Sequence, residues 1–369
     1  MTKAYAELHC HTDFSFLDGA SPADDLVERA VELGLSALAV TDHQGLYGAV
    51  RFSSAAREAG LHAVIGMEVE LLDAAAPDPE RIVVPRRRRK RHDDPPPRSS
   101  ARAGEPVRPE VERQRPPGHR EPRKEDLRGV RPRELGPHLT LLARDQTGYA
   151  NLCRLASAAH LAGTKGVPRF THESLTQHRD GLVILTGCRH GELPRRLLAG
   201  DREGAALALA QLGTIAAPGA LYVELQHHLL PDDDWLTAEL ARLAHEAGLP
   251  TVVTNDAHYA LRSDRELQDV LVSIRHGQDL EAAAHLRRPN GEYALKDGAE
   301  LGALPPGHSS DPLVRHAWLD GIKRAGDLAA SCQVSLEFER YRFPGFPVPG
   351  GETPFSYLER LCHDGVRQR

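Results

Sequence analysis

Short apolar runs alternate with amphipathic stretches of helical length along the first 260 residues. Seven of the runs have the length of buried strands. They are Tyr5–Leu8, Ala37–Val40, Ala63–Val69, Leu139–Ala143, Leu182–Leu185, Leu221–Leu225 and Thr251–Val253. Strands that alternate with helices pair in parallel through right-handed crossovers, so the pattern predicts an α/β fold. Seven such units favour a closed barrel, although the strand count alone leaves an open sheet as the alternative.

Five stretches between these runs have the apolar spacing of amphipathic helices. They are Pro22–Leu33, Leu46–Ala59, Tyr149–Ala162, Arg202–Ile215 and Asp234–Ala247. Ser21 followed by Pro22 predicts a helix start with Ser21 as the N-cap. Gly34 and Gly60 stand where a helix-ending glycine belongs.

The segment from about Pro85 to Pro137 interrupts this alternation. It begins with RRRRKR at 86–91, is rich in Pro and Arg, and has almost no apolar pattern. Such a segment cannot bury enough surface to offset its ordering entropy, so we expect a disordered insertion in the barrel. Residues 86–133 hold 17 Lys or Arg against 8 Asp or Glu, a net charge of +9. This basic run could bind nucleic-acid phosphates, and a solvated insertion without a partner is an equal alternative.

The pattern changes again after about Leu261, where it becomes helical and irregular, with a last helix predicted from Pro354. We therefore expect a barrel domain over residues 1–260 and a second, mostly helical domain over residues 261–369. The chain stops at Arg369 without a cap or closing strand, so we expect that second domain to be incomplete.

The composition is that of an ordinary globular protein, with 40% apolar and 27% charged residues. The start, MTKAYAELHCHTDF, has no apolar signal core, and no run approaches the ~18 apolar residues of a membrane span. We therefore expect a cytoplasmic protein without a membrane partner. Cysteines lie at positions 10, 153, 188, 332 and 362 without CxxC spacing, which argues against a disulfide framework or a zinc ribbon.

Metal-competent side chains gather where the predicted strands end. His9 and His11 close the first strand, and residues i and i+2 of a strand point to the same side, so the pair can present two imidazoles to one metal. Such a pair alone is more often two partly exposed histidines. Further polar residues, however, follow strand after strand at the end where the loops of a (β/α) barrel converge. They are Asp18, Asp42, His43, Glu68, Cys188, Asn255, Asp256 and His258.

These side-chain types indicate a class of chemistry. Imidazole, carboxylate and a candidate thiolate suit zinc, manganese or iron better than magnesium or calcium. Such ligands can hold two or three ions about 3.5–4 Å apart, which activate a water and clamp phosphoester oxygens. The sequence therefore predicts phosphoester hydrolysis. A GxSxG nucleophile elbow, a P-loop and a GxG dinucleotide fingerprint are all missing from it.

The phrases around these residues resemble a known family. HTDFSFLDGAS, GLYGAVRF, IGMEVEL, HLTLLARDQTGYANLCRLAS, LTGCRHGEL and TNDAHYALRSDRELQDVL are similar to the PHP (polymerase and histidinol phosphatase) domain of bacterial C-family DNA polymerases, the DNA polymerase III alpha subunits. The tail from Tyr341 resembles the segment that leads to the polymerase palm in their error-prone, mutagenesis-associated branch. The resemblance covers nearly the whole chain outside the insertion. It implies a PHP-type distorted (β/α)7 barrel followed by the start of a mostly helical polymerase segment.

The resemblance also implies a set of nine metal ligands. The matching positions are His9, His11, Asp18, His43, Glu68, His138, Cys188, Asp256 and His258, all but His138 and Cys188 also with a catalytic role. His138 departs from the pattern because it opens an apolar run instead of closing one. Asp42 is expected to orient a ligand from behind, and His227 and His228 are candidates for lining the site.

An intact ligand set in this family implies zinc or manganese binding and 3′–5′ exonuclease or related phosphoesterase activity, within a polymerase that acts in DNA replication, repair and damage tolerance. The implied partners are DNA and, through the missing part, a sliding clamp and accessory mutagenesis proteins. Two alternatives are a metal-stabilised scaffold for the polymerase and a free-standing phosphatase like histidinol phosphatase. Nucleotidyl transfer needs a palm with clustered aspartates, and no such cluster precedes Arg369, so this chain alone should not synthesise DNA.

Overall fold

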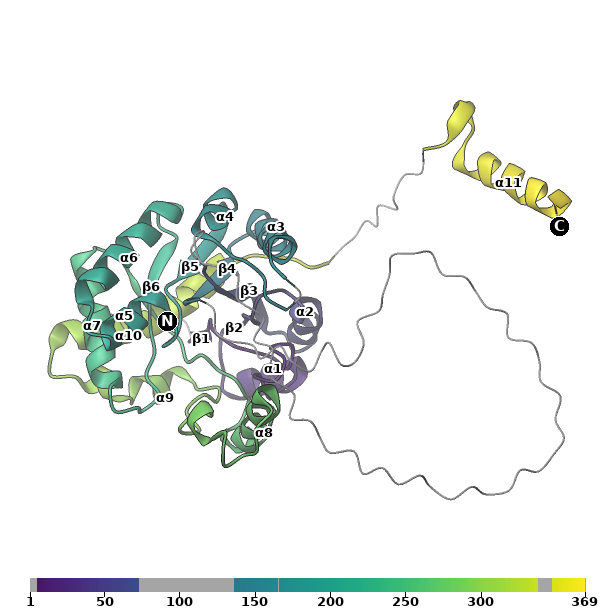
Figure 1. Cartoon of the computed structure of the whole chain (residues 1–369). Helices are drawn as coiled ribbons and strands as arrows, with labels where there is room; N and C mark the ends of the chain where they lie inside the picture. Colours follow the sequence, from purple (N-terminus) through teal and green to yellow (C-terminus); the bar gives the residue numbers. More distant parts are fainter. Residues whose placement is uncertain (1–4, 73–135, 165, 338–346, 369) are drawn as a thin grey trace, which may run out of the picture. The chain divides into compact units, whose positions relative to one another are not determined.

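The computed structural model describes residues 5–72, 136–164, 166–337 and 347–368. The basic stretch 86–133 and most of the tail around Tyr341 lie outside the described residues. In the described part, seven strands form one sheet in sequence order (Figure 1). They are β1 (Ala6–Glu7), β2 (Ala37–Val40), β3 (His62–Glu70), β4 (His138–Ala143), β5 (Leu182–Leu185), β6 (Leu221–Leu225) and β7 (Thr251–Val253). The seven predicted strands are therefore confirmed.

The sheet curls until the segments that follow its first and last strands meet. Cys10 and Ala257 form a parallel bridge, in which His11 N donates to Ala257 O at 2.8 Å and Ala257 N donates to His9 O at 2.9 Å. These bonds join the two edges of the sheet at the rim where the strands end. The curled seven-stranded sheet agrees with the predicted distorted barrel.

The prediction that all strands are parallel is wrong at β4. β4 runs antiparallel to β3, with Glu70 opposite His138, and antiparallel to β5, with Thr140 opposite Leu185. The other neighbouring strands pair in parallel. An apolar run reads the same in both directions, so the sequence pattern carries no information on strand direction. As a consequence, the first residue of β4 lies at the rim where the parallel strands have their last residues.

Helices cover the outside of the curled sheet (Figure 1). The described helices of the barrel unit are α1 (Ala23–Glu32), α2 (Ala49–Glu58), α3 (Gln146–Ala162), α4 (His172–Gln177), α5 (Glu192–Leu198), α6 (Arg202–Ile215), α7 (Asp233–Glu246), α8 (Arg265–His276), α9 (Gly298–Gly302) and α10 (Pro312–Ser331), with short 3-10 turns η1 (Arg262–Asp264), η2 (Ala284–Leu286) and η3 (Pro305–His308). The five predicted helices are confirmed within three residues at each end. α4 and α5 were not predicted because they are only one to two turns long.

The predicted helix caps have different outcomes. Gly34 and Gly60 end α1 and α2 in the left-handed conformation, with φ of +67° and +70°, which confirms their assignment. Ser21 does not cap α1, whose N-cap position is Pro22 without a side-chain hydrogen bond. The Ser21 hydroxyl instead accepts from Ala260 N at 2.9 Å and donates to Asp264 at 3.2 Å. Ser21 thus ties the start of α1 to the chain that follows β7.

The chain beyond residue 260 contributes a long helix to the barrel unit. α10 packs against β7, β1 and β2, and Gly321 allows this close approach because a Cβ there would lie 2.9 Å from a Val253 methyl group. Trp318 of α10 is buried and donates its indole N–H to Leu301 O at 2.9 Å. The described residues up to Val334 form one compact unit, and a second unit, Ser335–Arg369, contains η4 (Pro349–Gly351) and α11 (Pro354–Gln368). The assignment of residues 261–369 to a polymerase domain stays a prediction.

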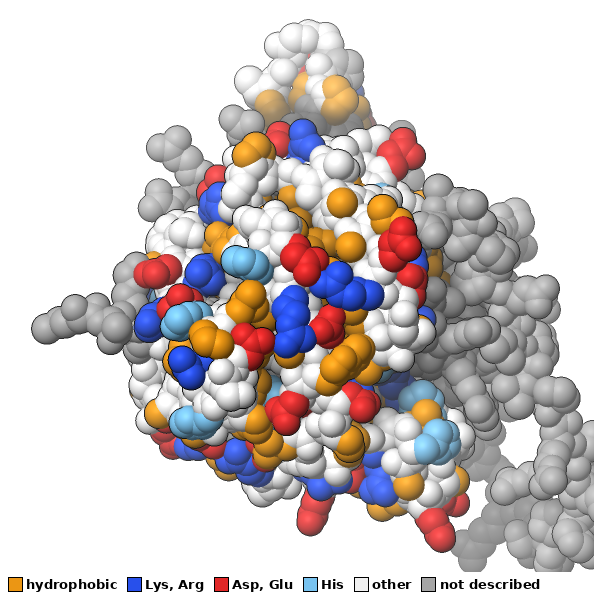
Figure 2. All heavy atoms as spheres, turned by 90° about the vertical axis from the view of Figure 1, so that its left-hand side faces the viewer, with side chains coloured by type: hydrophobic (Ala, Val, Ile, Leu, Met, Phe, Trp, Pro, Cys, Tyr) orange, Lys and Arg blue, Asp and Glu red, His pale blue; other side chains and the backbone are white. Residues whose placement is uncertain are grey.

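The outer surface over α7 and α10 is mixed in charge. Figure 2 shows acidic and basic side chains interspersed on this face. Arg242 pairs with Glu239 at 2.6 Å and with Asp311 at 3.0 Å, and Arg202 pairs with Glu239 at 3.0 Å. Charge is therefore balanced locally on this face. Among the described residues, every helix is too short or too polar to serve as a bilayer-spanning segment.

Candidate metal centre

The structure brings all nine predicted ligand residues together at one rim of the curled sheet. Most of them follow the carboxyl ends of strands, whereas Glu68 lies near the carboxyl end of β3 and His138 opens the antiparallel strand β4. The direction of β4 explains why His138 departs from the strand-end pattern. Its ring lies within hydrogen-bond distance of Glu68, 3.0 Å from Nδ1 to Oε1.

Glu68 is the centre of one half of the site. Its Oε1 lies 3.2 Å from His9 Nε2 and accepts from Cys188 Sγ at 3.4 Å. Its Oε2 lies 2.8 Å from His43 Nδ1. The position of Cys188 depends on the preceding Gly187, because a side chain there would lie 2.2 Å from His138 O and the backbone φ is +90°. One carboxylate therefore contacts donors from four other segments of the chain.

Asp256 is the centre of the other half. Its Oδ1 lies 3.3 Å from His11 Nε2, 3.5 Å from His9 Nε2 and 3.5 Å from His258 Nδ1. The Asp256 backbone has a φ of +48°, a left-handed conformation that is uncommon for a residue other than glycine. The bonds of Ala257 to the β1 segment hold this conformation, and such local strain is typical of functional sites.

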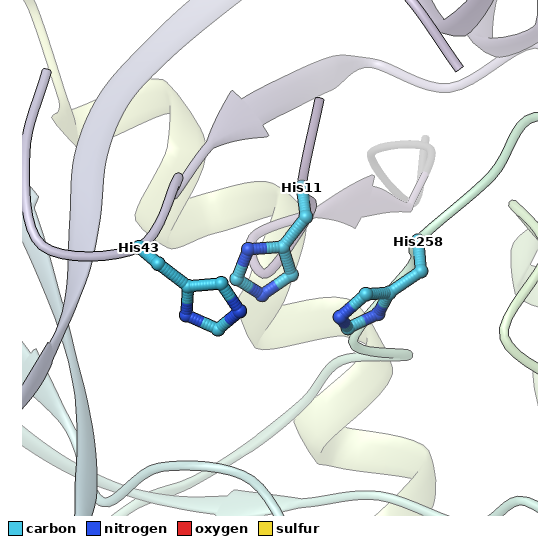
Figure 3. A group of neighbouring side chains, drawn as sticks. All are labelled: His11, His43 and His258. Carbon is cyan, nitrogen blue, oxygen red and sulfur yellow. The ribbon is translucent and has the colours of Figure 1, made fainter. Parts of the chain in front are cut away.

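Three groups of side chains have ligand atoms close enough to share a cation. In each group the atoms lie within 4.8 Å of one another. The groups are His11, His43 and His258; His9, His11 and Asp256; and Glu68, His138 and Cys188. Figure 3 shows the first group, in which three imidazoles from different segments converge. Asp18 lies beside that group, 2.9 Å from His43 Nε2.

Several polar atoms at the centre lie close to one another but form no well-oriented hydrogen bond among the described residues. They are His9 Nε2, His11 Nε2, Glu68 Oε2 and Asp256 Oδ1, and all are buried. An unsatisfied buried polar group costs about 1–3 kcal/mol, so four in one place require an explanation. Divalent cations would satisfy all four atoms. The mixture of imidazole, carboxylate and thiol is typical of sites for divalent metal ions, so the residues fit such ions.

Burial and neighbouring charges set the protonation of these groups. Burial opposes ionisation of Glu68, but His138 and His43 hold the pKa of Glu68 well below its usual range. Burial likewise disfavours protonated His43, but Asp18 and Glu68 raise the pKa of His43 to about 10. Burial and the Glu68 carboxylate raise the pKa of Cys188. A metal that binds here must therefore displace protons from His43 and Cys188.

Two buried carboxylates behind the centre were not predicted. Glu224 of β6 accepts from His9 Nδ1 at 2.7 Å, which leaves Nε2 directed at the centre. Glu7 of β1 accepts from the backbone N–H groups of His9 and Asn255 at 2.9 and 3.1 Å. Burial raises the pKa of Glu7 to about 7 despite these donors. An acidic residue inside an apolar strand was the available signal, because such a residue is seldom buried without a partner.

Asp42 is connected to His11 through the side chain of Ser15. Its carboxylate accepts from Thr12 N at 2.8 Å and from Ser15 Oγ at 2.7 Å, and Ser15 Oγ lies 3.1 Å from His11 Nδ1. Asp42 therefore fixes the loop that positions His11. It is not a member of the three candidate ligand groups.

The two histidines after β6 have different surroundings. His228 is stacked on Tyr293, with ring centroids 3.9 Å apart, and borders the cleft in front of the centre. His227 points elsewhere and lies 2.9 Å from Asp234 Oδ1. Of these two candidates for lining the site, His228 borders the cleft and His227 does not.

A cleft of about 750 Å³ opens over the centre. Candidate ligands form part of its lining, and arginines form another part, namely Arg189, Arg275, Arg287 and Arg288. These arginines were not predicted: Arg189 follows Cys188 but is not a metal-ligand type, and the other three lie beyond residue 260. The cleft thus combines cation-binding groups with groups that attract anions.

Comparisons with known proteins show which family the chain resembles. Residues 7–228 match the sequence model of the PHP domain family. The chain is 37% identical over 369 residues to the error-prone DNA polymerase of Mycobacterium bovis, covering 99% of this chain and 28% of the relative. It is 32% identical over 371 residues to the DNA polymerase III subunit alpha of Thermus aquaticus, covering 99% and 26%. A crystal structure from Bifidobacterium adolescentis, described as a metal-dependent phosphoesterase, is similar over 69% of this chain and 87% of that chain, at 17% identity and a TM-score of 0.37.

Proposed function

The chain belongs to the PHP domain family, and from this premise we propose that it hydrolyses phosphoesters at the 3′ end of DNA with two or three zinc or manganese ions. It spans only 28% of the length of the error-prone polymerase that it resembles, so we place this activity in a longer, cytoplasmic DNA polymerase of that type. A sliding clamp and accessory mutagenesis proteins would then be partners of the remainder. The observation that carries the proposal is the cluster of buried ligand atoms on His9, His11, Glu68 and Asp256 that form no well-oriented hydrogen bond.

Different residues of the chain would bind the ions, orient a ligand and form the wall of the cleft. The nine predicted ligands would hold the ions, and Glu224 would fix the His9 ring so that Nε2 faces them. When bound, such ions generate a nucleophile from water and stabilise charge on phosphoryl oxygens. The rim of the cleft would admit the DNA end, and His228 stacked on Tyr293 would form a rigid part of its wall.

A cleavage assay with the purified chain tests the proposal. A single-stranded oligonucleotide labelled at its 5′ end is incubated with protein that has been stripped of metal and reloaded with Mn²⁺ or Zn²⁺. We expect products shortened one nucleotide at a time from the 3′ end, and no products with His9→Ala. His227→Ala is the matched control, because His227 is also buried but lies outside the centre. Metal-loaded, folded protein that releases no nucleotide would refute the proposal.

A structural role for the ions is the second candidate. Segments that lie far apart in the sequence meet at Glu68 and Asp256, so ions bound there would cross-link the rim of the barrel. In that case metal would raise the melting temperature, and Asp18→Asn and Asp256→Asn would lower it, without any release of nucleotides. A matched loss of nuclease activity at unchanged stability would exclude a purely structural role. Turnover of histidinol phosphate faster than that of DNA ends would instead indicate a free-standing phosphatase.

A further inference from the structure

Two arginines from the chain beyond the family match contact one carboxylate of the metal centre. Arg288 Nη1 lies 2.9 Å from Asp18 Oδ1, and Arg275 Nη1 lies 3.3 Å from Asp18 Oδ2. The family match ends at residue 228, so it assigns nothing to either arginine. We propose that Arg275 and Arg288 form a phosphate clamp, which binds the non-bridging oxygens of the substrate's phosphoryl group at the Asp18 side of the cleft. This inference rests on the proposed function and names the residues that hold its substrate.

The charges around Asp18 support the clamp. Two guanidinium groups face a single carboxylate, and the Gln268 side-chain amide donates to the same carboxylate at 3.3 Å. One positive charge is therefore in excess at this position. Asp18 is also a proposed metal ligand, and a carboxylate that turns to a divalent cation leaves both guanidinium groups in need of another anion. A phosphoryl group that enters the cleft would supply that anion.

Both arginines are held in place and can be reached from the cleft. The Arg288 guanidinium lies over the Tyr293 ring, 4.8 Å from its centroid, and also contacts His258 Nε2. Arg275 stands in the last turn of α8, where the helix dipole favours a positive charge. The side chains of Arg288 and Arg275 are 19% and 22% exposed, and both border the cleft. Planar guanidinium groups bind two phosphate oxygens at once, which a lysine cannot do.

The neighbouring Arg287 provides a matched control. It borders the same cleft, but its Nη1 lies 3.0 Å from Asp269, a residue of α8 outside the candidate ligand groups. Asp269 would keep Arg287 paired whether or not ions are bound. The clamp therefore predicts different results for two adjacent arginines of the same charge.

Binding of inorganic phosphate to the Mn²⁺-loaded full chain tests the clamp by isothermal titration calorimetry. We expect Arg288→Ala and Arg275→Ala each to weaken phosphate binding roughly tenfold or more, because each removes a charge-assisted hydrogen bond. Arg288→Lys should recover only part of the affinity, and Arg287→Ala should change it less than about twofold. Elemental analysis should show the metal content unchanged. In the cleavage assay, the same two alanine variants should raise KM for the DNA more than they lower kcat.

The outcomes separate the clamp from the proposed function. If the wild-type protein releases no nucleotide, yet phosphate binding depends on Arg275 and Arg288, the nuclease proposal fails and the clamp stands. If nucleotides are released and both variants bind phosphate like the wild type, the clamp is wrong. Equal weakening by Arg287→Ala would show a general effect of positive charge and would also overturn it. Should Arg288→Ala not fold, Arg275→Ala and Arg288→Lys carry the same test.

Discussion

At the inner side of the metal centre carboxylates surround imidazoles, whereas at its outer edge arginines surround a carboxylate. The inner side comprises His9, Glu68 and Asp256 with Glu224 behind them, and it contains the buried atoms that form no well-oriented hydrogen bond. The outer edge comprises Asp18 with Arg275 and Arg288, and there two guanidinium groups share one carboxylate. The inner side is therefore where we propose that the cations bind. At the outer edge we propose that Asp18 turns to a cation while the arginines bind an anion.

The largest effect should follow from removing the charge of Glu68, on which the inner side depends. Glu68→Gln would take one carboxylate away from His9, His43 and His138 together. We expect both bound metal and nucleotide release to fall by more than about 100-fold, beyond the range for partners that act only through a ligand. Elemental analysis and the 3′-end assay measure the two effects. Glu70→Gln, two residues along β3 and outside the candidate ligand groups, should retain both.

A smaller effect is expected for Glu224, which contacts the centre through His9 and through the backbone of Gly187 next to Cys188. In Glu224→Gln the side chain keeps its shape but loses the charge that favours an Nδ1–H donor on His9. We expect metal affinity to fall roughly 10- to 100-fold, with the fold retained. Competition with a chromophoric chelator measures this affinity. An unchanged metal affinity would show that the orientation of His9 does not depend on Glu224. Glu224 would then have no role in metal binding.

Glu7 is the other buried carboxylate behind the inner side, and the pH dependence of the free energy of unfolding tests its raised pKa. Burial raises the pKa of Glu7 from 4.5 to about 7, so the folded protein binds a proton there more tightly than the unfolded chain does. The resulting stabilisation is complete below about pH 4.5 and is lost as the pH rises through about 7. Between about pH 5.5 and about pH 8 the wild type should therefore lose about 2 kcal/mol relative to Glu7→Gln. Urea unfolding with a chelator present measures the difference, and parallel pH profiles would contradict it.

The fold was largely predictable because its strands are short apolar runs bounded by polar loops. Ala37–Val40 and Leu182–Leu185 were predicted with their observed bounds. A strand that is buried on both faces needs apolar side chains at nearly every position, so such strands are easy to recognise in the sequence. The direction of β4 cannot be recognised from the apolar pattern, because it depends on how the chain returns to the sheet after β3. That single strand also decides where His138 lies.

Residues of the candidate site could be predicted from the pattern only where they stand near the end of a predicted strand. His9, Glu68 and Asp256 could be assembled from their positions at the rim, since the ends of neighbouring strands must meet there. Arg288 approaches Asp18 across 270 positions of the sequence, and no periodic pattern connects two such residues. Glu224 was overlooked for a related reason, since an acidic residue in a strand does not reveal which histidine it faces. The sequence thus reveals the inner side of the centre better than its outer edge.

The smallest expected effect concerns Asp18, where the two regions meet. In Asp18→Asn the two arginines lose the carboxylate that now pairs with them, so an added anion would no longer compete with it. In the chelated protein we therefore expect inorganic phosphate to bind roughly fivefold more tightly than in the wild type, a gain of about 1 kcal/mol. Arg287 keeps Asp269 as its partner, so Asp269→Asn serves as the control that removes a carboxylate from the other arginine. Tighter phosphate binding in Asp269→Asn but not in Asp18→Asn would move the anion site away from the metal centre. The outer edge would then have no role in releasing a cation ligand when an anion binds. The two regions would differ only in how deeply their charged groups are buried.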